Sequence, residues 1–217
     1  MTRLVVVRHA QSEGNLGHFC CGQVDVALTP FGLTQAEETA RFLDRYPLER
    51  IYSSDLIRVV ATAQPTAARQ GLEIIRTTAL REINTGDWEG VSHRDLDRDY
   101  PELREAWHHR FAEAVCPGGE SVRQLYDRIR VAFDALVSEN RGRTIGVFTH
   151  ATPVRSMLTV WRGQPFEAIT DTPWPSNASV TVVEYRDDGS IALEYAAYDA
   201  HLVAAGLAGN GSAPIRL

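Results

Sequence analysis

Short uninterrupted apolar runs alternate along the chain with longer segments in which apolar residues recur every three or four positions. The first run, at residues 4–7, is rich in valine and stops at Arg8. Runs of this kind are typical of strands that are covered on both faces of a parallel sheet. Similar runs lie in "RIYSSD", "LEIIRTT" and "RTIGVFTH". The pattern predicts a strand in each of them.

The segments between these runs have the spacing and the end signals of helices. Thr29 and Pro30 are a typical N-cap and first residue, and one apolar face follows at Leu33, Ala36, Ala40 and Leu43. The Ser and Asp that end "RIYSSD" are expected to cap a helix over residues 56–70. Ser121 and Gln124 form a capping-box pattern. The stripe that follows it is Val122, Leu125, Ile129 and Phe133.

Strands that alternate with helices are typical of α/β folds. We therefore expect a single three-layer domain over residues 1–217, with helices on both sides of a mostly parallel central sheet. "VTVVEY" and "IALEYAAY" flank the turn "RDDGS" and predict a hairpin. Residues 84–120 are expected to form a lid-like insertion that covers a site, and the last dozen residues a loose tail.

Composition and charge narrow the classes of function. The chain is 44% hydrophobic and 23% charged, which is ordinary for a globular protein. Its net charge of -6 argues against a nucleic-acid partner, so any phosphate must be bound by a local cluster of arginines. All 22 basic residues are arginine. The absence of lysine excludes a lysine Schiff base and a lysine-bearing phosphate loop.

Cysteine usage and hydropathy bear on the compartment. Cys20, Cys21 and Cys116 cannot all pair, and no CxxC spacing occurs. Reduced thiols in a cytoplasmic protein are the natural interpretation. No apolar stretch approaches about 18 residues and no export signal is visible, so we expect a soluble protein with no membrane partner.

Charged and imidazole side chains follow several of the predicted strands directly. Arg8 and His9 end the first strand, and His150 ends a later one. Arg58 follows the strand in "RIYSSD", and Glu82 follows the strand in "LEIIRTT". Ligands of open α/β sheets bind at the carboxyl ends of the strands, so these residues are expected to share one site.

The segments that hold these residues resemble the motifs of the histidine phosphatase superfamily, which includes the cofactor-dependent phosphoglycerate mutases. The similar segments are "VVVRHAQSEGN", "SSDLIRVVATA", "LREINTGDWEG", "CPGGES", "VFTH" and "SNASVTVVEY". They occur in the family's order and span about residues 4–185. The resemblance implies a phosphoglycerate mutase-like fold and phosphoryl transfer without a metal or another cofactor.

The resemblance also implies roles for the individual residues. Arg8 and Arg58 would bind the phosphate and stabilise the transferring phosphoryl group. His9, as neutral imidazole, would attack phosphorus and form a phosphohistidine. Glu82 would protonate the leaving alkoxide and then take a proton from water. These residues are the expected catalytic set, together with His150.

Further phosphate ligands follow from the same motifs. His150 would donate a hydrogen bond to a phosphoryl oxygen, and Asn15 and the backbone of Ala151 would bind the phosphate as well. Ala10 and Ala151 stand where the family usually has glycine. Alanine keeps the N–H group, but it would strain the site if either position required a positive φ.

Three functions remain open from the sequence. The first is a phosphatase of a small phosphorylated metabolite, and the second is a mutase that returns the phosphoryl group to its substrate. Mutases of this family typically have a longer shielding insertion, which favours hydrolysis here. The third is an inactive module that binds phosphorylated ligands, for which the two alanines are the only support. The substrate is not fixed, and a homodimer is possible.

Overall fold

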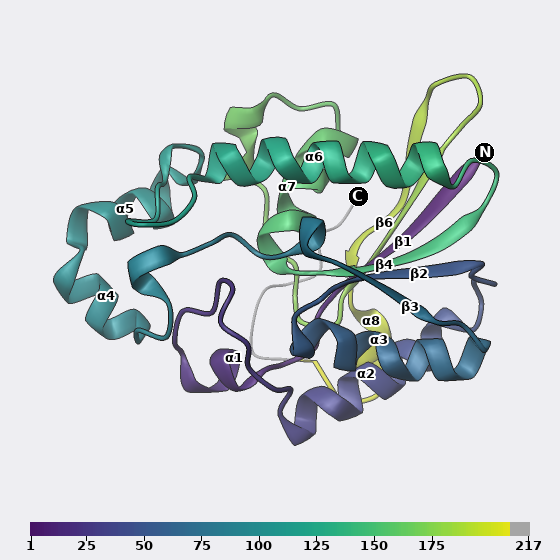
Figure 1. The fold of residues 1–217 in the computed structure, drawn as a ribbon, viewed down its shortest axis with the longest axis horizontal. Helices are drawn as coiled ribbons and strands as arrows, with labels where there is room; N and C mark the ends of the chain where they lie inside the picture. The colour runs from purple at the N-terminus through teal and green to yellow at the C-terminus, as the bar shows by residue number, and fades with distance from the viewer. Residues whose placement is uncertain (209–217) are drawn as a thin grey trace.

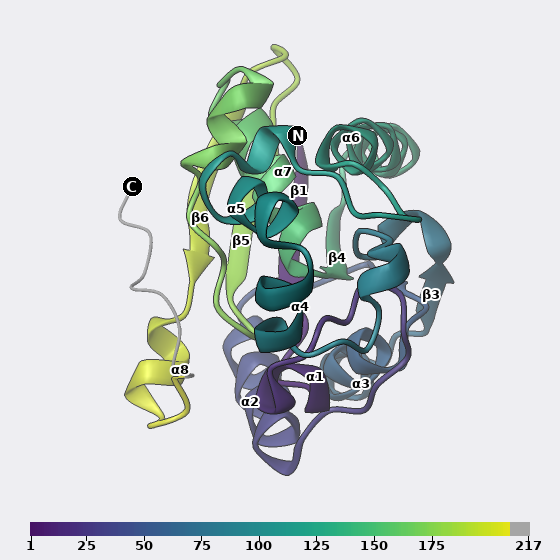
Figure 2. The ribbon, with the colours of Figure 1, turned by 90° about the vertical axis from the view of Figure 1, so that its left-hand side faces the viewer.

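The structure, a computed structural model, describes residues 1–208 and contains a six-stranded sheet between two layers of helices (Figures 1 and 2). The strands are β1 (Thr2–Arg8), β2 (Arg50–Ser54), β3 (Ile74–Thr77), β4 (Thr144–Thr149), β5 (Val180–Tyr185) and β6 (Ile191–Tyr198). The α-helices are α1 (Glu13–Gly17), α2 (Pro30–Leu43), α3 (Ile57–Gln70), α4 (His93–Asp99), α5 (Pro101–His109), α6 (Val122–Glu139), α7 (Ala151–Trp161) and α8 (Ala200–Ala204).

The sheet has the strand order β3-β2-β4-β1-β5-β6. The first four of these strands are parallel to one another, whereas β5 pairs antiparallel with both β1 and β6. The predicted mostly parallel sheet and the predicted hairpin are therefore confirmed. The parallel strands end at the same edge, which lies beneath α1, α4 and α5 (Figure 1).

The central strand β1 explains why its apolar run is uninterrupted. Leu4 and Val6 point into the core beneath α6 and α7, whereas Val5 and Val7 point into the core above α2 and α3. All four side chains are fully buried. Both faces of the sheet must therefore be apolar, and the helices lie above and below it (Figures 1 and 2).

The predicted N-caps of α2 and α6 are confirmed, and in both cases the capping residue directly precedes the helix. Thr29 Oγ1 accepts a hydrogen bond from the Gly32 amide, and the Ser121 capping box forms. The expected cap of α3 is wrong, because its N-cap is Leu56 and Asp25 Oδ1 accepts from the Ile57 amide instead. Leu33 was expected on the buried face of α2 but is 51% exposed.

Residues 84–120 form α4, α5 and short 3-10 turns at the carboxyl edge of the sheet (Figure 2). Trp88, Leu96 and Phe111 from this segment are fully buried in the same core as α6 and α7. The segment is therefore packed onto the domain. Of the predicted loose tail, residues 209–217 lie outside the described residues.

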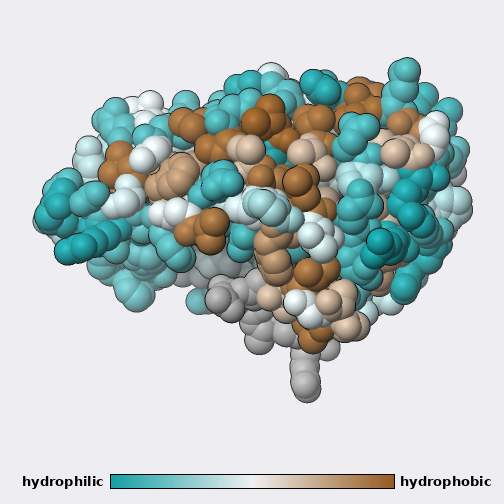
Figure 3. Space-filling view, turned by 90° about the horizontal axis from the view of Figure 1, so that it is seen from below, coloured by the Kyte–Doolittle hydropathy of each residue, from teal (hydrophilic) through white to brown (hydrophobic). Residues whose placement is uncertain are grey.

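The face of the molecule that Figure 3 shows is not uniformly apolar. Seen from the side of α2 and α3, a band of hydrophobic residues crosses the middle of the molecule between hydrophilic ends (Figure 3). The predicted homodimer stays a prediction. No helix among residues 1–208 has the length and apolar character needed to cross a membrane.

Candidate active site

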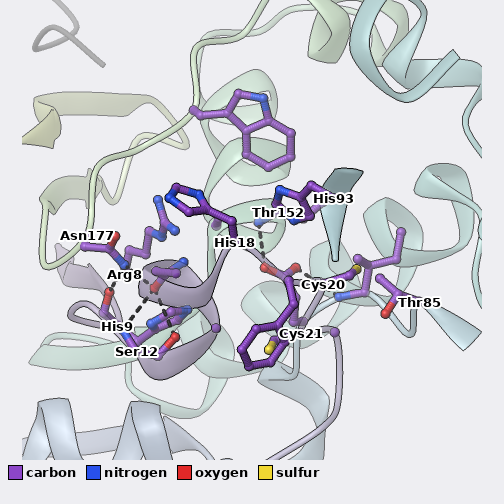
Figure 4. A pocket seen from close by; sticks show the side chains of 18 of the residues that line it. Arg8, His9, Ser12, His18, Cys20, Cys21, Thr85, His93, Thr152 and Asn177 are labelled. Atoms are coloured by element: carbon purple, nitrogen blue, oxygen red, sulfur yellow. Dashed lines mark hydrogen bonds between the residues drawn. The ribbon is translucent and has the colours of Figure 1, made fainter. Parts of the chain in front are cut away.

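A cavity of about 680 Å³ opens at the carboxyl edge of the parallel strands (Figure 4). Its lining includes most of the residues that the sequence assigned to phosphate binding and catalysis. They are Arg8, His9, Asn15, Arg58, Glu82 and Ala151. His150 is fully buried behind this surface and is not part of the lining. The topology thus brings together residues from four separate segments of the chain.

His9 is held in one tautomer by its own backbone. Its Nδ1 lies 2.8 Å from the carbonyl oxygen of Ala10, and because that oxygen can only accept, Nδ1 bears the proton. The lone pair is therefore on Nε2. Burial, with the charges of Arg58 and Arg8, holds the pKa of His9 well below its ordinary value. The ring is a neutral imidazole at physiological pH, as a nucleophile must be.

The two site arginines are fixed by backbone carbonyl groups. Arg58 donates to the carbonyl oxygens of Gly22 at 2.8 Å and Val24 at 2.9 Å, and Arg8 donates to that of Pro175. Burial and the nearby Arg58 lower the pKa of Arg8 to about 10, so that both side chains stay charged at neutral pH. The buried Nε of Arg8 has no partner among the described residues. It is available to a bound anion.

His150 contacts Arg58 and Ser54. Its Nδ1 accepts from Arg58 Nη2 at 3.1 Å, and its Nε2 therefore donates to Ser54 Oγ at 2.9 Å. Its ring meets that of His9 edge-on, with centroids 5.3 Å apart. Both ring nitrogens are occupied, so direct hydrogen bonding to a phosphoryl oxygen would require one contact to be exchanged. That role stays a prediction.

Glu82 lies in the loop after the 3-10 turn Thr78–Leu80, and its carboxylate contacts the first turn of α7. Its Oε2 accepts from the Thr152 amide at 3.3 Å, and its Oε1 accepts from the Ile83 amide at 2.9 Å. Its own carbonyl oxygen accepts from Arg128 Nη2 at 2.8 Å, and Arg128 also binds both carboxylate oxygens of Glu120. The Glu120–Arg128 ion pair therefore fixes the loop that presents the carboxylate of Glu82 to the cavity.

Asn15 is oriented by its neighbours. Its Oδ1 accepts from the Ser12 amide and from Asn177 Nδ2, both at 3.1 Å. This leaves the Asn15 amide group to donate toward the cavity that it lines. Asn177 Nδ2 also lies 3.1 Å from the His9 carbonyl oxygen, so one side chain aligns two site residues (Figure 4).

The two alanines that replace the family's usual glycines are accommodated without backbone strain. Neither Ala10 nor Ala151 has a positive φ. The Ala10 amide donates to Thr62 Oγ1 at 3.0 Å, and Ala151 lines the cavity as the first residue of α7. Neither position requires a positive φ, so the condition under which alanine would strain the site is not met, and the only support for an inactive module is removed.

Several residues whose hydrogen bonds hold the loops and side chains of the site in place were not singled out by the sequence analysis. Glu89 accepts hydrogen bonds from the amides of Gln23 at 2.7 Å, Val24 at 3.0 Å and Thr85 at 3.2 Å. It thereby joins the loop that holds Arg58 to the loop that presents Glu82. Arg128 and Asn177 act in a similar way. Their sequence positions carry no signal for these contacts, which exist only in the folded chain.

The remote wall of the cavity comes mainly from two segments. One follows His9 and contributes His18, Phe19, Cys20 and Cys21. The other is the predicted insertion, which contributes His93, Arg104, Trp107 and His108. All three cysteines of the chain are free thiols. The insertion thus borders the cavity, as expected of a segment that contacts the leaving group.

The neutral histidines make stability depend on pH. Burial lowers the pKa of His9 and His150, and that of His201 to about 4. An unfolded histidine titrates near pH 6.5, so below about that pH the unfolded chain binds more protons than the folded one. The free energy of unfolding, measured by urea denaturation, should be constant above about pH 7.5 and fall as the pH drops toward about 5. A value that rises on acidification would contradict this assignment.

The comparisons with known proteins agree with the geometry. The family model described as histidine phosphatase superfamily (branch 1) matches residues 4–197. Phosphoserine phosphatase 1 of Hydrogenobacter thermophilus is 30% identical over 197 residues, covering 89% of this chain and 92% of that protein. A 2,3-bisphosphoglycerate-dependent phosphoglycerate mutase of Cytophaga hutchinsonii is 31% identical over 163 residues, which cover 73% of this chain and 76% of that protein. The solved structure of a mycobacterial glucosyl-3-phosphoglycerate phosphatase superposes with a TM-score of 0.81 at 31% identity, covering 88% of this chain and 96% of that one.

Proposed function

The chain belongs to the histidine phosphatase superfamily (branch 1), and from that premise we propose that it hydrolyses a small phosphomonoester through a phosphohistidine on His9. Relatives that are named phosphatases support a phosphatase. The observation that carries the mechanism is the His9 tautomer, because the bond from Nδ1–H to the Ala10 carbonyl leaves the Nε2 lone pair free. A nucleophile in this state lies in one cavity with two arginines and the carboxyl group of Glu82.

In the first step, His9 Nε2 attacks phosphorus and the bond from phosphorus to the ester oxygen breaks. Glu82 gives its proton to the departing alkoxide, which leaves as an alcohol. Arg8 and Arg58 stabilise the negative charge on the equatorial phosphoryl oxygens, and Asn15 adds a neutral donor. The charge is neutralised by arginine side chains, so the step needs no metal ion.

In the second step, the carboxylate of Glu82 takes a proton from water as the water oxygen attacks phosphorus. The bond from phosphorus to Nε2 breaks, and inorganic phosphate leaves. His9 regains its neutral form, because its proton stays on Nδ1, hydrogen-bonded to the Ala10 carbonyl oxygen, throughout. Glu82 is protonated again, and both residues have returned to their starting state.

Phosphoryl transfer back to the substrate is the second candidate, supported by the mutase among the relatives. It differs from hydrolysis only in the final acceptor, which is a second hydroxyl group of the substrate instead of water. The segment at residues 84–120 contributes only part of the cavity wall, and this favours access of water to the phosphohistidine.

Phosphate release in the presence of EDTA tests the proposal. The panel contains phosphoserine, 3-phosphoglycerate, sugar phosphates and nucleotides, and every sample is also analysed for positional isomers of the substrate. Release of inorganic phosphate without isomers is expected. Isomer formation without release would assign the chain to the mutases, and turnover that requires an added metal would overturn the mechanism.

A further inference from the structure

We propose that Arg104 forms a second anion-binding site in this cavity, and that the preferred substrate has a carboxylate on its leaving group. The inference rests on the proposed function, because it assumes that a phosphomonoester occupies the site described above. It is independent of the substrates named for the relatives. It follows from one buried guanidinium that the catalytic steps do not use.

Arg104 is an unusual cavity residue because it is charged and almost completely buried. It lies on α5, is 6% exposed and lines the cavity. Its Nε donates to Asp97 at 2.7 Å, and its guanidinium carbon lies 5.7 Å from the centre of the Trp88 ring. Its terminal nitrogens donate to no side chain or backbone group among residues 1–208, yet neither is sealed from the cavity. A guanidinium in this setting is stabilised when an acceptor reaches its free edge.

The position of Arg104 places this edge away from the segment that holds the nucleophile. Arg104, His93 and Trp107 line the cavity from the insertion, whereas His9 directly follows β1. Figure 4 shows His9 on one side of the pocket and Cys20 on the other. Arg104 therefore lies on a wall of the cavity where it can contact the part of a substrate beyond the phosphate.

The charges around Arg104 favour a carboxylate over a second phosphate. Its hydrogen bond to Asp97 lowers the pKa of that carboxyl group, so Asp97 is ionised and offsets the positive charge. Burial and the charge of Arg104 lower the pKa of His93, so this neighbour is neutral at physiological pH and adds no positive charge. The net positive charge around Arg104 is too small to balance a phosphate dianion. A monoanionic carboxylate matches the two parallel N–H groups of the free guanidinium edge.

The test uses two ligands that differ only at this group. Glycerol 3-phosphate and 3-phosphoglycerate have the same phosphate ester, but the first has a hydroxymethyl group where the second has a carboxylate. Calorimetry measures their dissociation constants in a His9→Ala background, which binds without turnover. The variants compared there are Arg104→Gln and the control Arg98→Gln, which removes an exposed charge from α4 of the same segment. The control corrects for general attraction of the more highly charged ligand.

We expect 3-phosphoglycerate to bind about 10- to 100-fold more tightly than glycerol 3-phosphate, as for a hydrogen-bonded ion pair. Arg104→Gln should reduce this ratio to near one, whereas Arg98→Gln should preserve it. A ratio that survives Arg104→Gln, or an equal loss of both ligands, would overturn the inference and leave hydrolysis by the native enzyme intact. Hydrolysis that fails while the ratio behaves as expected would instead overturn the proposed function.

Discussion

Replacing His9 with alanine should lower kcat by at least about 10⁴-fold while leaving the fold intact, because the variant lacks the nucleophile on which both chemical steps depend. The His9 ring accepts no hydrogen bond from any described side chain, and its only polar contact is to its neighbour's carbonyl. Its removal therefore breaks no long-range hydrogen bond and costs only the edge-on ring contact with His150. Circular dichroism and urea denaturation would establish that the variant is folded.

The covalent intermediate gives this prediction a second readout. Rapid acid-free quenching and mass spectrometry of the native enzyme with substrate should find one added phosphoryl group on the peptide that contains His9. His109→Ala is the matched control, because His109 is exposed and lies outside the cavity. Its turnover and its phosphorylation should equal those of the native chain. Substantial turnover by His9→Ala would overturn the covalent mechanism.

The strand positions could be predicted from the sequence because a strand that is buried on both faces has an uninterrupted run of apolar residues. Residues 4–7 are apolar without interruption because β1 lies between β4 and β5 and is covered by helices on both sides. The cap of α3 could not be predicted in this way, because the Ile57 amide donates to Asp25, which belongs to a distant segment of the chain. Leu33 fits the helical period of α2, but it lies at the margin of the buried stripe, where period alone does not decide exposure.

In the site as well, some features follow from residues that are adjacent in the sequence, whereas others depend on contacts between distant segments. Arg8 and His9 follow β1 directly, so the strand that predicts them also positions them. The Glu120–Arg128 pair and the free edge of Arg104 depend on how α5 and α6 pack, and residue type alone does not reveal them. The tautomer of His150 likewise required both of its partners to be seen. Motifs predicted the reacting groups, while the contacts that orient them are visible only in the fold.

Replacing Glu82 with glutamine should produce an effect that depends on the leaving group. An alkoxide is a poor leaving group and needs the proton that Glu82 supplies, so phosphorylation of the enzyme by alkyl phosphates should slow by about 10²- to 10⁴-fold. Nitrophenolate leaves without protonation, so the same step with p-nitrophenyl phosphate should slow by less than about tenfold. Glutamine keeps an oxygen that can accept from the Ile83 amide, and it loses only the longer bond at 3.3 Å from the Thr152 amide.

Stopped-flow measurement of nitrophenol release separates the two roles of Glu82. Loss of the base slows attack by water on the phosphohistidine, so the variant should show a burst of about one nitrophenol per site followed by slow turnover. Glu102→Gln is the matched control, since Glu102 is exposed on α5 and lies outside the cavity lining. It should retain native rates with both substrates. Equal slowing of the alkyl and nitrophenyl esters, with no burst, would mean that Glu82 shapes the cavity and transfers no proton, because only a proton donor can distinguish leaving groups by their basicity.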